Sequence, residues 1–184
     1  MKHFRRNLLL SLSLVAAASL AFADEKPRVS PHETITANID GSDVTIVYGR
    51  PYTKDPKSGA ARKIWGELVP FGKVWRTGAD EATLLTLKQA FDIGGTTVPA
   101  GTYSLFTLPA ENGGAKLIVN KQTGQWGTKY DEKEDLARID MKKEAIDKPV
   151  DQFTMALEKN SAGGGTLKMS WEKMQYSVAL KAKK

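Results

Sequence analysis

Arginine, tryptophan and acidic side chains gather in one irregular stretch of the sequence, residues 49–83. Guanidinium groups bind carboxylates and phosphates through paired hydrogen bonds, and indole rings stack on sugars or apolar groups. A stretch this long between regular elements is typical of a functional loop. We therefore expect it to bind a small polar ligand, a glycan or a peptide. The candidate ligand-binding residues in it are Arg50, Arg62, Trp75, Arg76 and Glu81.

A second group of candidates lies further along the chain, in the glycine-punctuated loop of residues 120–130. Trp126 and Tyr130 extend the ligand-binding surface if this loop approaches residues 49–83. The alternative is that Trp126 packs as a lid on the core, which is the commoner use of a large aromatic side chain.

A purely structural role also explains the first group. Trp65 and Trp75 can close one end of the fold, while the three arginines pair with acidic residues. Such ion-pair networks tie down long loops without any ligand. The residue types leave both interpretations open. The acidic candidates for this pairing are Asp80, Glu81 and Asp135.

Familiar catalytic motifs are absent from the sequence. The chain has no cysteine, which excludes thiolate nucleophiles, disulfides and Cys-ligated zinc. It also contains no HExxH metal motif, no GxSxG nucleophile elbow, no P-loop and no dinucleotide-binding fingerprint. We therefore expect neither a metal nor a cofactor.

One enzyme hypothesis remains, a carboxylate-dependent hydrolase acting on an envelope polysaccharide or peptide. Glu81 would act as acid or base and Arg76 would hold an oxyanion, with His32 as a further proton carrier. Neighbouring Asp80 and Glu81 point to opposite faces of an extended chain, so a second carboxylate must come from elsewhere. The candidates for this second carboxylate are Asp131 and Asp135.

Alternation of apolar and polar residues predicts the strands that position these side chains. Residues 34–48 predict a hairpin around Asp40-Gly41, and residues 91–98 predict another around Gly94-Gly95. Near the end of the chain, apolar residues change from odd to even positions. Because a slip of one residue exchanges the faces of a sheet, this change requires a turn or bulge at residues 172–175.

Short strands at close spacing predict an all-β fold. We expect a single-domain antiparallel two-sheet β-sandwich, or a flattened barrel, with one long irregular loop region and little helix. Residues 62–68 and 132–137 could each make a helical turn or two. The predicted domain covers residues 32–182, preceded by an extension at residues 24–31.

Residues 1–23 have the three regions of a secretory signal peptide. A basic start precedes the apolar run Leu8–Leu20, and Ala21-Phe22-Ala23 supplies the small residues of a cleavage site. We therefore expect an exported, soluble protein, periplasmic or secreted, with no membrane insertion after signal cleavage.

The net charge of +6 belongs to the precursor. Removing Lys2, Arg5 and Arg6 leaves 24 basic residues against the 21 acidic ones, a net charge of +3. An exported chain with so small a basic excess is not expected to bind nucleic acid.

Several ordered blocks carry a family resemblance. They read GRP at 49–51, LVPFG at 68–72, VWRTGADEAT at 74–83, PAGTYSLF at 99–106, NK at 120–121 and WG at 126–127, followed by Tyr130. These blocks are similar to those of the domain of unknown function 2911 family, over essentially the whole mature chain. The resemblance implies an exported bacterial β-rich domain and brings no established activity, cofactor or catalytic residue. We expect asparagine more often at the position of Asp80, which makes Glu81 the better candidate for an acid, base or arginine anchor.

These observations together predict a non-catalytic binding or accessory module, with the hydrolase as the alternative. The sequence does not indicate an oligomeric state.

Overall fold

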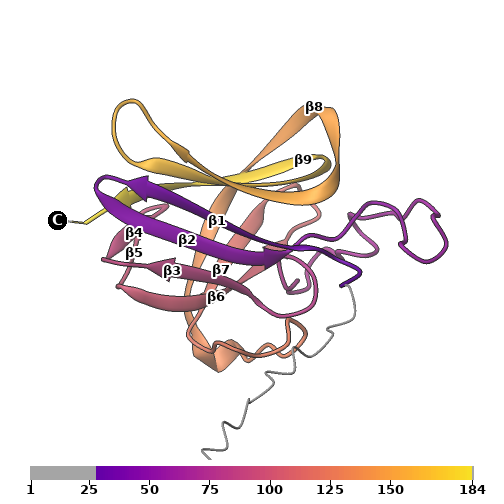
Figure 1. Ribbon diagram of the computed structural model, residues 1–184, viewed down its shortest axis with the longest axis horizontal. Coiled ribbons are helices and arrows are strands. Elements are labelled where there is room, and N and C mark those ends of the chain that lie inside the picture. Colours follow the sequence, from indigo (N-terminus) through magenta and orange to yellow (C-terminus); the bar gives the residue numbers. More distant parts are fainter. Residues whose placement is uncertain (1–27, 184) are drawn as a thin grey trace, which may run out of the picture.

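A computed structural model describes residues 28–183 (Figure 1). The predicted signal peptide, residues 1–23, and the first four residues of the predicted extension lie outside these. The described chain is built of nine strands and one turn of 3-10 helix, η1. They are β1 (His32–Ile39), β2 (Ser42–Gly49), β3 (Thr83–Leu87), β4 (Phe91–Ile93), β5 (Thr96–Val98), β6 (Gly101–Pro109), β7 (Ala115–Asn120), η1 (Glu132–Glu134), β8 (Asp135–Lys159) and β9 (Gly165–Ala182).

The strands form one antiparallel sheet in the order β1-β2-β3-β6-β7-β8-β9-β4-β5. Strand β8 connects the two parts of this sheet, because its first residues pair with β7 and its later residues pair with β9. The long β8–β9 hairpin crosses over β1 and β2 (Figure 1). The predicted all-β, single-domain antiparallel fold is therefore confirmed. The two layers expected of a sandwich are formed by one open sheet that folds over itself.

The first hairpin forms where the sequence predicts it. Asp40 and Gly41 have positive φ angles of 51° and 88°, as a two-residue hairpin turn requires. The pairing runs from His32 opposite Gly49 to Ile39 opposite Ser42. Because the turn fixes this register, His32 lies at the far end of the hairpin, where β2 runs into the irregular segment.

Aromatic side chains fill the space between the two layers at this same end of the molecule. The ring of Trp75 stacks on Trp171 at a centroid distance of 5.9 Å and meets Phe153 edge-on at 5.1 Å. Tyr48 ties β2 to β8, since its hydroxyl accepts a hydrogen bond from the backbone N–H of Met155 at 2.9 Å. Burial raises the pKa of Tyr48 to about 12, so it remains a neutral donor.

Strand β9 contains the predicted change of face. Glu172 interrupts it with a left-handed φ of 52°, and the pairing of β8 shifts register between Ala145 and Val150 and again before Thr154. The alternating apolar residues on both sides of this point are buried, namely Leu167, Met169 and Trp171 before it and Tyr176, Val178 and Leu180 after it. The strand thus continues through a kink instead of ending in a turn.

The long irregular segment, residues 50–82, links β2 to β3 and is the predicted loop region. It contains no helix, so the turn expected at residues 62–68 is not helical, whereas residues 132–134 do form η1. Between residues 28 and 183 no helix is both long and apolar enough to cross a bilayer.

Candidate functional site

A strained turn at Thr77–Asp80 forms the base of the candidate site. Thr77 and Asp80 have left-handed φ angles of 53° and 64°, a conformation that costs a residue such as threonine about 1–2 kcal/mol and an aspartate less. Hydrogen bonds hold the turn in place. The Thr83 hydroxyl donates to the Thr77 carbonyl at 2.7 Å, and the Thr77 and Thr107 hydroxyls lie 2.7 Å apart. Strain retained by surrounding contacts is a feature of functional sites.

Two glycines let the backbone of β2 approach this turn. A Cβ atom at Gly49 would overlap the carbonyl oxygen of Ala79, and one at Gly78 would lie 2.8 Å from the carbonyl oxygen of Gly49. The backbone N–H of Ala79 donates to that same Gly49 oxygen at 3.3 Å. The sharp bend at residues 77–80 is therefore fixed against the end of β2.

A third glycine docks the loop of residues 121–131 onto the other side of the turn. The Gly127 N–H donates to the Asp80 carbonyl at 2.9 Å, and the Ala82 N–H donates to Gln125 at 3.1 Å. A Cβ atom at Gly127 would lie 2.8 Å from both Cβ and Cδ of Arg76. The stem of Arg76 is thus packed directly on this glycine.

These segments enclose a cleft of about 470 Å³, which we call the arginine cleft. Four of the predicted ligand-binding residues, Arg62, Trp75, Arg76 and Tyr130, line it, so the two predicted groups of residues do come together. Its other lining residues are Val29, Ser30, Pro51, Leu68, Pro70, Val74, Gly78, Ala79, Asp80, Gly127 and Thr128.

The arginines of the cleft form no close ion pair in the described chain, although Arg62 contributes, as the weakest cause, to lowering the pKa of Asp55. Within residues 28–183, neither Arg62 nor Arg76 has a carboxylate within 4.0 Å. Arg76 donates from Nε to the Gly78 carbonyl at 3.2 Å, and Arg62 donates to the Tyr52 carbonyl. Two guanidinium groups beside apolar walls can hold a carboxylate or phosphate whose remaining body is apolar.

Acidic side chains and a histidine meet at the edge of the cleft. His32 Nε2 lies 3.4 Å from a carboxylate oxygen of Asp80 and 3.4 Å from one of Glu81. Arg28 donates to Glu81 as well, and this hydrogen bond is the main reason that the pKa of Glu81 is lowered. We call these four residues the His32 cluster.

The expectation that Asp80 and Glu81 point to opposite faces does not apply here. That prediction assumes an extended backbone, whereas the left-handed Asp80 turns both carboxylates toward His32. Asparagine and aspartate are the residues other than glycine that best tolerate this conformation, so either one fits position 80. The more distant carboxylates serve elsewhere. Asp131 caps η1, and Asp135 binds Tyr130 and Arg138.

Among the predicted residues, Trp75 forms a buried wall of the cleft, while Arg50 and Trp126 do not line it. Trp75 is only 8% exposed and belongs to the core, as the structural interpretation predicts. Arg50 pairs with Glu33 at 3.2 Å and donates to the carbonyl of Phe153, so it joins β2 to β8. Trp126 is 48% exposed and does not line the cleft.

The predicted pairing of the three arginines with Asp80, Glu81 or Asp135 is wrong within the described residues. Glu33 is the partner of Arg50, and sequence reasoning did not consider this residue. Arg28, the partner of Glu81, was missed as well, because it lies in the extension before the first strand. No group of three or more His, Asp or Glu side chains in residues 28–183 is arranged to hold a metal ion.

Comparison with known proteins places the chain in a family. A family model described as protein of unknown function (DUF2911) matches residues 30–180. The chain belongs to this family. No curated protein matches the chain, and no solved structure does.

Three of the blocks that carry the DUF2911 resemblance, at residues 49–51, 74–83 and 126–127, lie together in the fold. Residues 74–83 form the strained turn, while Gly49 packs against its Ala79 and Gly127 packs against its Arg76. Gly49, Gly78 and Gly127 therefore allow close backbone approach around one cleft.

Proposed function

We propose that this DUF2911 protein is an exported binding or accessory module whose arginine cleft holds a small anionic ligand. The ligand class is a carboxylate- or phosphate-bearing fragment of a glycan or peptide. Export is proposed from the signal-peptide pattern of residues 1–23, which favours the periplasm or the exterior.

One observation carries this proposal, the pair of arginines that form no close ion pair. Arg62 and Arg76 both line the cleft, and neither has a carboxylate within 4.0 Å in the described chain. Arg50 and Arg138, by contrast, each bind a carboxylate. The volume of the cleft lies within the range of about 300–1,000 Å³ common for small-molecule sites.

The experiment is calorimetric titration of the purified protein with N-acetylmuramoyl dipeptide and glucose 6-phosphate, with uncharged chitobiose as the neutral comparison. We expect an anionic probe to bind and Arg76→Leu to weaken it at least tenfold. Lys129→Leu is the matched control, because Lys129 is an exposed cation beside the cleft that does not line it. Equal loss in both variants, or binding of chitobiose alone, would argue against an anion site.

The His32 cluster supports a second candidate, the carboxylate-dependent hydrolase. His32 Nε2 lies 3.4 Å from a carboxylate oxygen of each of Asp80 and Glu81, so an imidazole stands beside two carboxylates. The Arg28 guanidinium lies 3.2 Å from the same nitrogen. Because its pKa is lowered, Glu81 is ionised at neutral pH and would act as a base or nucleophile. Hydrolysis of polymeric envelope material that is abolished in both Glu81→Gln and His32→Gln would support this function. Turnover that survives in either variant would rule out the proposed roles.

A further inference from the structure

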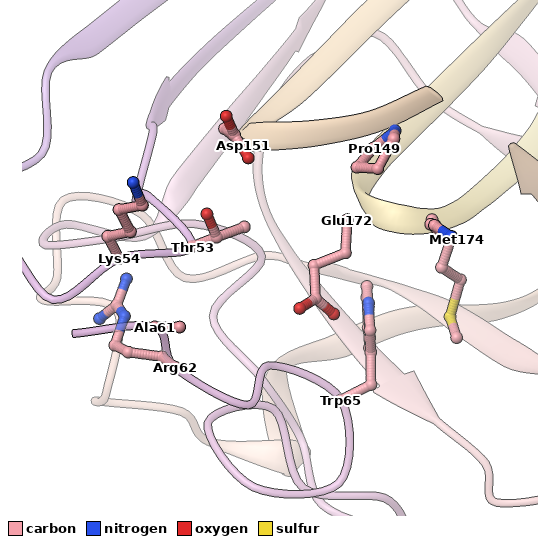
Figure 2. A pocket seen from close by; sticks show the side chains of 10 residues that line it. Thr53, Lys54, Ala61, Arg62, Trp65, Pro149, Asp151, Glu172 and Met174 are labelled. Atoms are coloured by element: carbon pink, nitrogen blue, oxygen red, sulfur yellow. The ribbon is translucent and has the colours of Figure 1, made fainter. Parts of the chain in front are cut away.

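A second cavity, of about 540 Å³, lies on the other side of Arg62, between the irregular segment and the kinks of β8 and β9. Figure 2 shows how its side chains are arranged. Lys54 and Arg62 lie on one side, Trp65 and Met174 lie on the opposite side, and the carboxylate of Glu172 projects between them. Asp151 also lines this cavity.

The charged side chains around the cavity do not pair with one another. Within residues 28–183, no ion pair within 4.0 Å involves Lys54, Arg62, Asp151 or Glu172. The Nε atom of Arg62 is buried without a hydrogen-bond partner in the described chain. Opposite charges that line one cavity without meeting leave room for a molecule that contacts both.

The backbone holds Glu172 in place at a cost. Its φ of 52° is left-handed, a conformation that a glutamate rarely adopts, and the partner strand is irregular on both sides of Val150, which pairs with it. Bulges and strained residues of this kind often aim a side chain at a functional site. Desolvation raises the pKa of Glu172, as expected of a carboxylate that lacks a cation.

The aromatic wall is rigid. The indole N–H of Trp65 donates to the carbonyl of Trp171 at 3.3 Å, and its ring packs edge-on against Tyr176 at a centroid distance of 5.5 Å. An indole ring close to a carboxylate is suited to hold an organic ammonium group, through cation–π attraction and charge. The thioether of Met174 adds an adaptable apolar surface beside it.

We propose that this cavity binds a small zwitterion, an amino acid or short peptide with an apolar side chain. Its ammonium group contacts Glu172 and the face of Trp65, and its carboxylate contacts Arg62 and Lys54. The apolar side chain lies against Met174. The site is distinct from the arginine cleft and shares only Arg62 with it.

The test is calorimetric titration of the purified protein with leucyl-leucine, leucine, N-acetyl-leucyl-leucine and leucyl-leucine amide. We expect leucyl-leucine or leucine to bind, with a loss of at least tenfold when either terminus is blocked. Tight binding of leucine indicates a free amino acid as the ligand, and binding of leucyl-leucine alone indicates a peptide. The proposal is overturned if no probe binds, or if the blocked peptides bind as tightly as the free one.

Variants assign the two ends of the ligand. Glu172→Gln should weaken leucyl-leucine at least tenfold and leave N-acetyl-leucyl-leucine unchanged, while Lys54→Met should affect only ligands with a free carboxylate. Glu67→Gln is the matched control, because this carboxylate is exposed outside the cavity. Arg76→Leu should leave leucyl-leucine binding unchanged, which separates this site from the arginine cleft. If Glu172→Gln weakens free and acetylated peptide equally, or Lys54→Met weakens the amide as well, the assignment is wrong.

Discussion

Replacement of Gly127 by alanine tests whether the turn and the docked loop are held in the close packing described above. The φ angle of Gly127 is not in the left-handed region, so alanine brings no backbone strain. The added Cβ would, however, lie 2.8 Å from Cβ and from Cδ of Arg76, and 2.9 Å from the Asp80 carbonyl oxygen. The Arg76 Cβ and the Asp80 carbonyl are fixed by the backbone, so the turn itself must shift.

The expected cost follows from the overlap. Inserting a methyl group into a closely packed site costs about 1–3 kcal/mol. For a chain of this size, each kcal/mol lowers the melting temperature by about 2–4 °C, so Gly127→Ala should lower it by about 2–12 °C. Because Asp80 and Arg76 shift with the turn, ligand binding in the arginine cleft should weaken as well.

Thermal and urea unfolding followed by circular dichroism measure this cost. Gly114→Ala is the matched control, because its φ is also not left-handed and its nearest neighbour to an added Cβ is Asn112 Oδ1 at 3.7 Å, an ordinary contact. The control should be neutral or stabilising by up to about 1 kcal/mol. A Gly127→Ala variant as stable as Gly114→Ala would refute the packing of the turn and loop.

Three further comparisons of variants separate structural from functional roles. Trp75→Ala should destabilise the fold by about 3–5 kcal/mol, whereas exposed Trp126→Ala should cost less than about 1 kcal/mol, in urea unfolding. In the same measurement, Asp80→Asn should leave the free energy of unfolding nearly unchanged, whereas Asp80→Val should lower it by about 1–2 kcal/mol, because asparagine tolerates a left-handed backbone and valine does not. Because the pKa of Glu81 is lowered in the folded protein, its ionised carboxylate stabilises the fold at pH values above its ordinary pKa. This contribution to the free energy of unfolding is lost as the pH falls through the lowered pKa. The free energies of unfolding of Glu81→Gln and wild type should therefore converge at acid pH. If the difference between them is the same at every pH, the Arg28 contact is not the source of the stabilisation.

The strands and their buried faces can be predicted from the sequence because turn residues and apolar alternation depend only on neighbouring residues. Asp40-Gly41 favours the positive φ angles that its turn adopts, and alternation assigns the buried positions on either side. The change of face near Glu172 is predictable for the same reason. The full length of β8 is not, because its first half carries many charged residues on a strand exposed along one face.

The candidate site depends on contacts that no local pattern encodes. His32 reaches Asp80 only because the β1–β2 hairpin returns it to the end of β2, beside the strained turn. The residue type of Trp75 fits either a ligand platform or a core position, and only the layer formed by β8 and β9 decides for the core. The cavity around Glu172 likewise forms where distant segments meet, so apart from Arg62 its residues were not predicted as ligand-binding residues.

The most direct test of the central claim is a heteronuclear NMR titration of the protein with N-acetylmuramoyl dipeptide and glucose 6-phosphate. Binding in the arginine cleft predicts that the largest amide shifts fall at Gly78, Gly127 and Thr128, and that they disappear in Arg76→Leu but persist in Lys129→Leu. The claim is contradicted if neither probe causes shifts, or if the shifts lie away from the cleft and survive in Arg76→Leu.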